Sequence, residues 1–315
     1  MFTKLLVPLD GTVEAAAALP AATTLAHATG ASITLVRVTA NSGDDPAEAR
    51  VGGLIAEDEV RAAAEDLARG GLLVDSLVRA GPVPESIIQA AQVSKADVIV
   101  MATHGRVGIS RAFAGSVSER VVADSGRLVL LLKPDDKRLN HIATLLVPVD
   151  GTAGGVLGLG TAVGLAQATG ARLVLLDGVP PMPTWMYGSE VGFVGAVGYF
   201  DPVWEEEALR SAETYVSGLA ERLRKTGLHV ETRALRGEIA STIHAVSDET
   251  DTDLVVMSTH ALTGPARAVL GSVADAVVRT SHRPVLLVRR PGGTLDDKED
   301  ALEPTSEVAR SSPVG

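Results

Sequence analysis

Short apolar runs alternate along the chain with longer stretches in which apolar positions recur every three or four residues. The short runs indicate buried strands, and the longer period indicates helices with one apolar face. In the first half we predict strands near Lys4–Leu9, Ser32–Val38, Leu72–Arg79, Asp97–Met101 and Arg127–Lys133. The segments between them predict helices near Val13–Thr29, Pro46–Arg69, Pro84–Val93 and Ser116–Asp124.

Strands that alternate with helices are typical of βαβ units in a parallel sheet, because parallel neighbours need a crossover connection. The sequence therefore predicts an α/β fold of the doubly wound kind, with helices on both faces of a five-stranded parallel sheet. Ligands of such sheets bind beyond the carboxyl ends of the strands, where the strand order reverses. Asp10 ends the first predicted strand and Ala102 ends the fourth. If these strands are neighbours, both residues face one crevice.

The second half of the chain repeats the first. Four blocks recur in the same order, with Leu5–Thr12 as Leu145–Thr152, Ala26–Ala31 as Ala166–Ala171, Met101–His104 as Met257–His260 and Gly115–Val117 as Gly271–Val273. The last two blocks are displaced by about 16 residues more than the first two, so the second copy carries an insertion. Collinear repeats of this length predict two tandem domains, over residues 1–138 and 139–290.

The segment Met101–Ser116 (MATHGRVGISRAFAGS) joins the predicted fourth strand to the next helix. Gly105 and Gly115 permit positive φ and a close approach of the backbone to a ligand. A helix that starts at Ser116 would direct free N–H groups and the positive end of its dipole toward an anion. The segment therefore predicts a phosphate site.

Two features of this segment also have a structural interpretation. Ser116 and Ser272 each stand three residues before an acidic residue, which is the spacing of a capping box at a helix start. His104, which recurs as His260, suggests a catalytic base, but no Ser, His and Asp set can be assembled from the spacing. We interpret the histidine as a residue that orders the loop. No GxxxxGK[ST], GxGxxG or HExxH motif occurs in the chain, so a dedicated ATPase apparatus is unsupported.

These residues resemble the universal stress proteins, in a tandem member with two such domains, over about residues 1–290. The nucleotide-binding pattern of that family is a glycine, two residues, a glycine, nine residues and then Gly-Ser or Gly-Thr. The matching places hold Ala102, Gly105 and Gly115-Ser116 in the first copy, and Ser258, Ala261 and Gly271-Ser272 in the second. The resemblance implies the strand order 3-2-1-4-5, with ATP between strands one and four in members that bind it. Because the second copy lacks both early glycines, we expect the first domain to bind ATP and the second to be degenerate.

The resemblance and the predicted crevice together select a set of nucleotide-binding candidates. They are Pro8, Asp10, Val38, Met101, Ala102, Gly105, Arg106, Gly115, Ser116 and Val117. The family's counterpart of Asp10 contacts the nucleotide near adenosine, and the alternative is a turn or N-cap carboxylate before the helix near Thr12. Val38 matches the region where the family's backbone meets adenine. Arg106 and Arg111 could pair with phosphates, or be solvated surface arginines.

The composition of the chain limits the binding partners, the kinds of site and the location that we expect for it. A formal net charge of −11 argues against nonspecific binding of nucleic acid, which requires clustered Lys and Arg. The absence of cysteine excludes disulfides, thiolate metal sites and cysteine nucleophiles. No apolar run is long enough to span a membrane, and the N-terminus lacks the features of a signal peptide. We therefore expect a cytoplasmic protein.

Three further parts of the sequence lead to structural predictions. Six of the chain's nine aromatic residues lie between Trp185 and Trp204, in the insertion at residues 180–204, which could cover a crevice, form an interface, bind an apolar partner or fold onto its own domain. Residues 291–315 are rich in charge, Ser, Pro and Gly and are expected to be disordered. The strands Leu128–Leu132 and Val285–Val288 are expected at sheet edges, where their pairing would relate the two copies by a pseudo-two-fold axis.

The sequence thus predicts a stress-response protein that binds ATP, with Mg²⁺, in its first domain as a regulatory ligand. A protein partner of unknown identity would read the nucleotide state. The two domains would form an intramolecular pseudo-dimer, and a homodimer is left open. Two alternatives remain: a slow ATP hydrolase, and an interaction or dimerisation module without nucleotide.

Overall fold

A computed structural model describes residues 2–39, 46–103, 116–137, 139–152, 155–181, 202–259 and 270–289. The first half forms β1 (Lys4–Leu9), α1 (Val13–Ala16), α2 (Ala18–Thr29), β2 (Ser32–Thr39), α3 (Pro46–Arg69), β3 (Val74–Ala80), α4 (Val83–Ser94), β4 (Val98–Ala102), α5 (Ser116–Asp124) and β5 (Leu128–Leu132). The second half forms β6 (Thr144–Pro148), α6 (Gly155–Thr169), β7 (Arg172–Val179), α7 (Pro202–Arg224), β8 (Val230–Arg236), α8 (Ile239–Glu249), β9 (Leu254–Ser258), α9 (Ser272–Thr280) and β10 (Val285–Val288).

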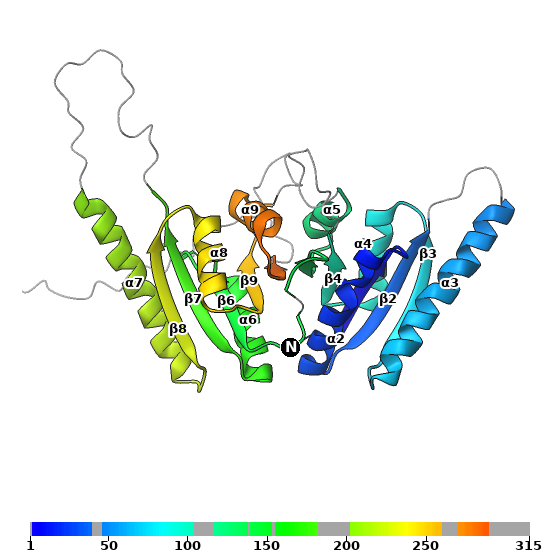
Figure 1. The fold of residues 1–315 in the computed structure, drawn as a ribbon, viewed down its shortest axis with the longest axis horizontal. Coiled ribbons are helices and arrows are strands. Elements are labelled where there is room, and N and C mark those ends of the chain that lie inside the picture. The colour runs from blue at the N-terminus through cyan, green and yellow to red at the C-terminus, as the bar shows by residue number, and fades with distance from the viewer. Residues whose placement is uncertain are drawn as a thin grey trace, which may run out of the picture.

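The strands of both halves join in one ten-stranded sheet, in the order β3-β2-β1-β4-β5-β10-β9-β6-β7-β8 (Figure 1). Within each half the pairs are parallel and the order is 3-2-1-4-5, as the resemblance implied. The prediction of two tandem doubly wound domains is therefore confirmed. The exact bounds 1–138 and 139–290 stay a prediction. Most of the insertion at 180–204 and all of the tail 291–315 lie outside the described residues.

The helix expected over Val13–Thr29 is wrong as a single element, because α1 ends at Ala16 and α2 begins at Ala18. Pro20 explains the break: it has no N–H to donate to the carbonyl of Ala16, and its ring would clash with that carbonyl in a continuous helix. The repeat supplies a natural control. Gly160 stands at the matching place in α6, which runs unbroken from Gly155 to Thr169.

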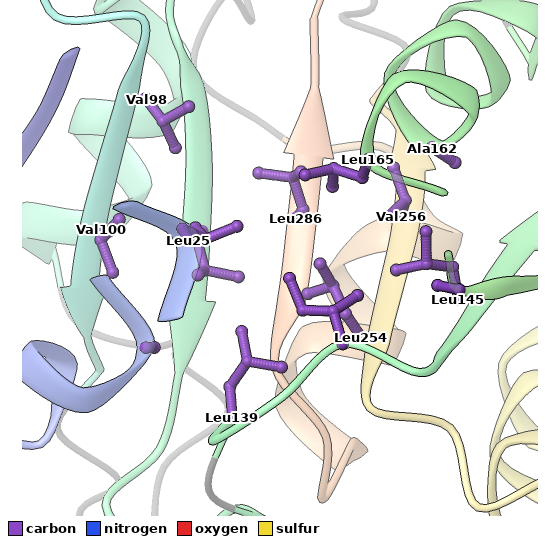
Figure 2. Packing of buried hydrophobic residues seen from close by; sticks show 14 of the residues in the cluster. Leu25, Val98, Val100, Leu139, Leu145, Ala162, Leu165, Leu254, Val256 and Leu286 are labelled. Carbon is purple, nitrogen blue, oxygen red and sulfur yellow. The ribbon is translucent and has the colours of Figure 1, made fainter. Parts of the chain in front are cut away.

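Two apolar layers cover the two faces of the sheet. On one face α2, α3, α6 and α7 bury a cluster that runs through both domains, and Figure 2 shows Leu25 of α2, Leu139 of the linker and Leu286 of β10 within it. On the other face α4, α5, α8 and α9 bury a second cluster around Ile87 and Ile243. Because the first cluster is continuous across the centre, α2 packs against α6 and the two domains share a core.

The centre of the sheet is an antiparallel pair. Leu130 of β5 faces Leu286 of β10, so the two apolar strands that would otherwise be edges cover each other. This is the pairing expected from a pseudo-two-fold arrangement. Every other strand pair in the described sheet is parallel, so the two copies meet at this junction through the same strand of each, in antiparallel orientation.

A cation from each domain binds the end of a helix in the other. Lys133, which follows β5, donates from Nζ to the carbonyl oxygens of Arg279 and Ser281 at the end of α9, at 2.8 and 2.6 Å. Arg289 follows β10 in the same way and donates from Nη1 to the carbonyl oxygens of Val122 and Ala123 at the end of α5. We call Lys133 and Arg289 the exchanged caps. Each supplies positive charge where a helix dipole and its free carbonyls are negative.

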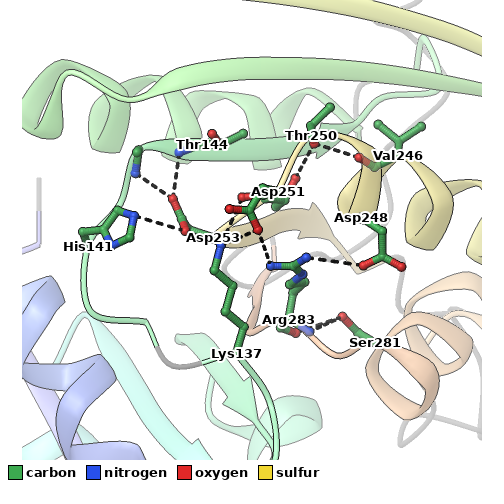
Figure 3. A network of polar contacts seen from close by, with 12 residues as sticks. Lys137, His141, Thr144, Val246, Asp248, Thr250, Asp251, Asp253, Ser281 and Arg283 are labelled. Atoms are coloured by element: carbon green, nitrogen blue, oxygen red, sulfur yellow. Dashed lines mark hydrogen bonds and ion pairs between the residues drawn. The ribbon is translucent and has the colours of Figure 1, made fainter.

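The linker between the domains is held by a polar network around Asp253 (Figure 3). Asp253 is 4% exposed, and its Oδ2 accepts hydrogen bonds from the backbone N–H groups of Ala143 and Thr144 at 2.9 and 3.0 Å. Its Oδ1 lies 3.0 Å from Nζ of Lys137 and 3.6 Å from Nε2 of His141, both on the linker. The network ties the segment that leaves the first domain to the start of β6 and β9.

Asp97 repeats this arrangement in the first domain. Its Oδ2 accepts hydrogen bonds from the backbone N–H and the hydroxyl of Thr3, at 2.6 and 2.8 Å, and from the N–H of Lys4 at 3.1 Å. Burial on its own would raise the pKa of Asp97, but these hydrogen bonds outweigh it and hold the pKa below its usual value. The carboxylate of Asp97 is therefore a fixed link between the starts of β1 and β4.

The lowered pKa of Asp97 predicts a pH-dependent contribution to stability. Because the folded pKa lies below the unfolded value of about 3.9, the contribution is fully present above that value and is lost as the pH falls through the folded pKa. We expect Asp97→Asn to lower the free energy of unfolding by about 1 kcal/mol at pH 7, an estimate that allows for partial solvent exposure. Urea unfolding at pH 7 and pH 3 measures this. A difference from wild type that is equal at both pH values would contradict it.

Candidate functional site

The ends of β1 and β4 lie side by side, as the predicted crevice requires. Leu5 and Leu6 of β1 pair with Val98 and Ile99 of β4, while β2 lies on the other side of β1. The connection from β1 leads to β2, and β4 is reached only after β3, so the strand order reverses between β1 and β4. This reversal is the point at which doubly wound sheets bind ligands.

Asp10 is exposed at the end of β1 and organises the turn that follows. Its Oδ1 accepts hydrogen bonds from the N–H and the hydroxyl of Thr12, at 2.9 and 2.5 Å. The hydroxyl oxygen of Thr12 in turn accepts from the N–H of Ala15, so Thr12 is the N-cap of α1. Of the two structural roles considered for Asp10, the turn carboxylate is confirmed and the N-cap is wrong.

The other first-domain candidates in the described part of the chain lie on β1, β2, β4 and α5. Val38 and Val117 pack against the same apolar cluster as Met101, on the face covered by α4 and α5. Ala102 is buried at the end of β4, Pro8 lies in β1, and Ser116 is the first residue of α5. Gly105, Arg106 and Gly115 lie outside the described residues, as do Arg111, His104 and His260.

The second domain shows the same region as a cavity of about 760 Å³. Through the repeat, eight of the ten candidate positions of the first domain have counterparts that line this cavity: Pro148, Asp150, Gly178, Met257, Ser258, Gly271, Ser272 and Val273. The other two counterparts, Ala261 and Leu262, lie outside the described residues. A cavity of this size accommodates a ligand of nucleotide dimensions. The sequence identified the cavity's position, although it assigned a degenerate site to this domain.

The capping box expected at Ser272 is wrong. Ser272 is the first residue of α9, Gly271 is the N-cap, and no side chain caps the helix. Asp275 instead forms an ion pair with Arg279 at 3.0 Å. Within the described part of the chain the start of α9 thus has no side-chain cap, and its first residues, Gly271 and Ser272, line the cavity.

The two domains differ in charge at the end of their second strands. In the first domain the guanidinium of Arg37 lies over Gly11, where φ is +81° and a Cβ would come within 2.8 Å of Arg37 Nη2. Arg37 also pairs with Glu59 of α3 at 3.6 Å. A positive charge therefore lies one residue from Asp10, beside the predicted crevice.

In the second domain the matching residues are Asp177 and Tyr215. Burial raises the pKa of Asp177, and the negative charge of Asp150 raises it further. Burial also raises the pKa of Tyr215, and both carboxylates add to this effect, while the positive charge of Arg222 and a hydrogen bond from the N–H of Gly151 act in the opposite direction. The β6 exit thus carries two neighbouring carboxylates and a phenol, whereas the β1 exit carries the carboxylate of Asp10 and the ion pair of Arg37 with Glu59.

Sequence reasoning missed Arg37, Glu59, Asp177 and Tyr215 as site-adjacent residues. None of them belongs to the glycine pattern, which is why the pattern did not select them. The signal that could have found them is the repeat, because aligning the two copies sets Arg37 against Asp177 and Glu59 against Tyr215. Among the residues that the structure describes, no three His, Asp or Glu side chains are grouped as a metal site would need.

Fold and site together define a class: tandem doubly wound α/β proteins whose strand ends meet at a switch-point crevice in each domain. The model of the family described as "Universal stress protein family" matches residues 1–133 and 141–289. The chain belongs to the universal stress protein family. In its described part, no helix is long and apolar enough to cross a lipid bilayer.

Several relatives resemble the chain over different spans. A universal stress protein of Mycolicibacterium smegmatis is 27% identical over 225 residues, which is 70% of each chain. A universal stress protein of Thermus aquaticus is 36% identical over 138 residues, covering 42% of this chain and 100% of that protein. The crystal structure of a universal stress protein from Archaeoglobus fulgidus has a TM-score of 0.68 at 20% identity, over 91% of this chain and 96% of that one. The similarity to the Archaeoglobus fulgidus structure shows that the two chains share a fold.

Proposed function

We propose that the first domain binds Mg-ATP as a regulatory ligand at the crevice between the ends of β1 and β4. The observation that supports this proposal most directly is the internal repeat, through which the candidate positions recur in the second domain. Eight counterparts of the candidate residues gather around one cavity of about 760 Å³ in the second domain, which supports a ligand pocket at the same place in the first. Asp10, Val38 and Ala102 would line the adenosine end. Gly105, Gly115 and the start of α5 would bind the phosphates.

Charge favours the first domain over the second for this ligand. A nucleoside triphosphate brings about four negative charges. Arg37 lies beside Asp10 and its charge is balanced by Glu59, so this side of the first crevice carries one negative charge fewer than the matching residues of the second domain. In the second domain the same place holds Asp177, next to Asp150. This contrast adds an electrostatic reason to the loss of the early glycine at Ala261. The family membership supports a stress-response role, in which a partner would read the nucleotide-bound state.

A pair of matched substitutions tests the proposal. We expect wild-type protein to bind about one Mg-ATP per chain, and Gly115→Val to abolish binding because a branched side chain would stand where the backbone must approach the phosphates. Gly271→Val is the control at the matching place of the second domain. Gly271 has φ of −54°, which valine tolerates, so its substitution should leave the stoichiometry at one. Isothermal titration calorimetry measures both.

Other outcomes would identify the alternatives. Phosphate release from ATP that disappears in Asp10→Ala would favour a slow hydrolase over a binding protein. Absence of both titration heat and a thermal shift with ATP would overturn the proposal and favour an interaction module in which Gly105 and Gly115 serve the turn. Equal binding at two sites, with Gly115→Val losing one of them, would show that the second domain also takes the triphosphate.

A further inference from the structure

A separate cavity lies where the two domains meet. Its volume is about 350 Å³, and most of its lining is apolar. The lining includes Pro20 beside the break between α1 and α2, Leu139 of the linker and Pro284 just before β10. A ligand in this junction cavity would therefore contact both domains. Cavities at domain interfaces are common places for small ligands to bind.

One buried carboxylate oxygen in the junction cavity has no partner. Asp136 lines the cavity and is 9% exposed. Its Oδ2 accepts a hydrogen bond from the N–H of Lys133 at 2.7 Å, whereas its Oδ1 is buried and accepts none. Burial raises the pKa of Asp136, and the hydrogen bond and the positive charges of Lys133 and His282 only partly offset this. A buried polar atom without a partner costs free energy, which a ligand that donates a hydrogen bond would restore.

The two lysines that line the cavity use their ammonium groups elsewhere. Nζ of Lys133 binds carbonyl oxygens at the end of α9, and Nζ of Lys137 lies 2.7 Å from Asp251 and 3.0 Å from Asp253 (Figure 3). Glu14, which is exposed on α1, adds a second carboxylate to the lining. The groups that remain to bind a ligand are therefore acidic, and they favour a cation.

Both carboxylates are particular to one copy of the repeat. At the offset of the first two repeated blocks, Gly154 stands against Glu14. At the offset of the last two blocks, Gly292 stands against Asp136. The two glycines lie outside the described residues, but neither has a side chain that could supply a charge. The sequence therefore provides this pair of acidic groups on only one side of the pseudo-two-fold junction.

We propose that the junction cavity binds a small organic cation, with its ammonium group on Oδ1 of Asp136 and its apolar body against the walls. A metal ion would need several oxygen ligands, and no three His, Asp or Glu side chains of the described residues are grouped for one. A water molecule would need about two to four polar partners in a cavity that is mostly apolar. An alkyl or aryl ammonium fits both parts of the cavity, because it donates to the carboxylate and buries apolar surface.

This site is independent of the proposed nucleotide site. None of the nucleotide-binding candidates in the described part of the chain lines the junction cavity. The result of an ATP titration therefore neither supports nor contradicts the binding of an organic cation.

Four small probes test the chemistry of the ligand. Benzylamine and n-hexylamine carry the ammonium group, and benzyl alcohol and n-hexanol are their neutral counterparts of the same size. We expect NMR titration of the full-length protein to show one saturable amine site per chain, with shifts at the amides of Asp136 and Lys137. Each alcohol should bind at least about tenfold more weakly, because hydrogen bonds between charged groups contribute more than those with a neutral partner.

A pair of charge substitutions tests the role of Asp136. Asp136→Asn removes the charge but keeps an oxygen that can accept from the N–H of Lys133, and we expect the affinity for benzylamine to fall at least about tenfold. Asp135→Asn is the matched control, because it makes the same change in charge at the adjacent, exposed residue, which does not line the cavity. Its affinity should stay at the wild-type value, since water and salt screen an exposed charge.

A second pair of substitutions tests the place of binding. Ala16 of α1 lines the cavity, so Ala16→Phe should fill it and abolish amine binding. Ala62→Phe is the control, at an exposed position of α3 outside the cavity, and should keep the wild-type affinity. Thermal melting of each variant shows whether it folds.

Four results would overturn the proposal. They are that neither amine binds, that the alcohols bind as tightly as the amines, that Asp136→Asn keeps the wild-type affinity, or that Asp135→Asn lowers the affinity as much as Asp136→Asn. The last result would mean that the amine responds to the net charge of −11 and not to the buried oxygen.

Discussion

Asp253→Ala is expected to destabilise the protein by about 3 kcal/mol. The carboxylate is 4% exposed and accepts hydrogen bonds from the N–H groups of Ala143 and Thr144 at the start of β6. Removing it leaves the N–H of Thr144, a buried residue, and the N–H of the more exposed Ala143 without this acceptor, and a buried unsatisfied donor costs about 1–3 kcal/mol. Lys137 also loses a partner at 3.0 Å. Urea unfolding at pH 7 measures the loss.

Asp251→Ala is the matched control in the same network. Asp251 contacts the same Lys137 at 2.7 Å and Arg283 at 3.1 Å, but its side chain is 79% exposed. Exposed ion pairs contribute little to stability because water screens them. Asp251 has φ of +48°, which alanine adopts less readily than aspartate, so we expect a small loss of stability that stays well below that of Asp253→Ala. If Asp251→Ala destabilised the protein as much as Asp253→Ala, the ion pairs to Lys137 rather than the buried backbone hydrogen bonds would hold the linker.

The positions of the strands could be predicted from the sequence, because their apolar runs are short, well separated and repeated. The sequence was also sufficient for the pairing of Leu128–Leu132 with Val285–Val288, since two apolar edges must be covered. It failed where one residue decides a local geometry. Pro20 lies inside a helical period, and only the folded chain shows that α1 stops before it.

The candidate site was predictable to a smaller extent. The glycine pattern predicts a crevice beyond the ends of β1 and β4, and these strands are neighbours. Val38 and Val117 pack against the cluster that contains Met101, while the site itself stays a prediction. The pattern says nothing of Arg37 or Asp177, because they lie on the neighbouring strand and act through charge rather than through contact spacing. It also assigned a degenerate site to the second domain from the loss of both early glycines, at Ser258 and Ala261, whereas most of the matching positions line a large cavity there.

Removing the exchanged caps is expected to loosen a helix in the domain that was not mutated. Lys133→Ala takes two hydrogen bonds from the end of α9, and Arg289→Ala takes those at the end of α5. A cation on the last carbonyls of a helix contributes about 1–2 kcal/mol when it is partly buried, so each variant should lose that much stability. The loss is transmitted across the β5–β10 junction, because each cap is covalently part of the other domain's sheet.

Hydrogen exchange followed by mass spectrometry distinguishes this from a general loss of stability. In Lys133→Ala the amides of α9 should exchange faster while those of α5 keep their wild-type rates, and in Arg289→Ala the pattern should reverse. Arg61→Ala is the control, since Arg61 is 63% exposed and pairs only within α3 among the contacts described. Equal deprotection of α5 and α9 in either variant would contradict reciprocal capping. Because α5 and α9 also begin at the two crevices, a reciprocal pattern would give each crevice a physical link to the opposite domain.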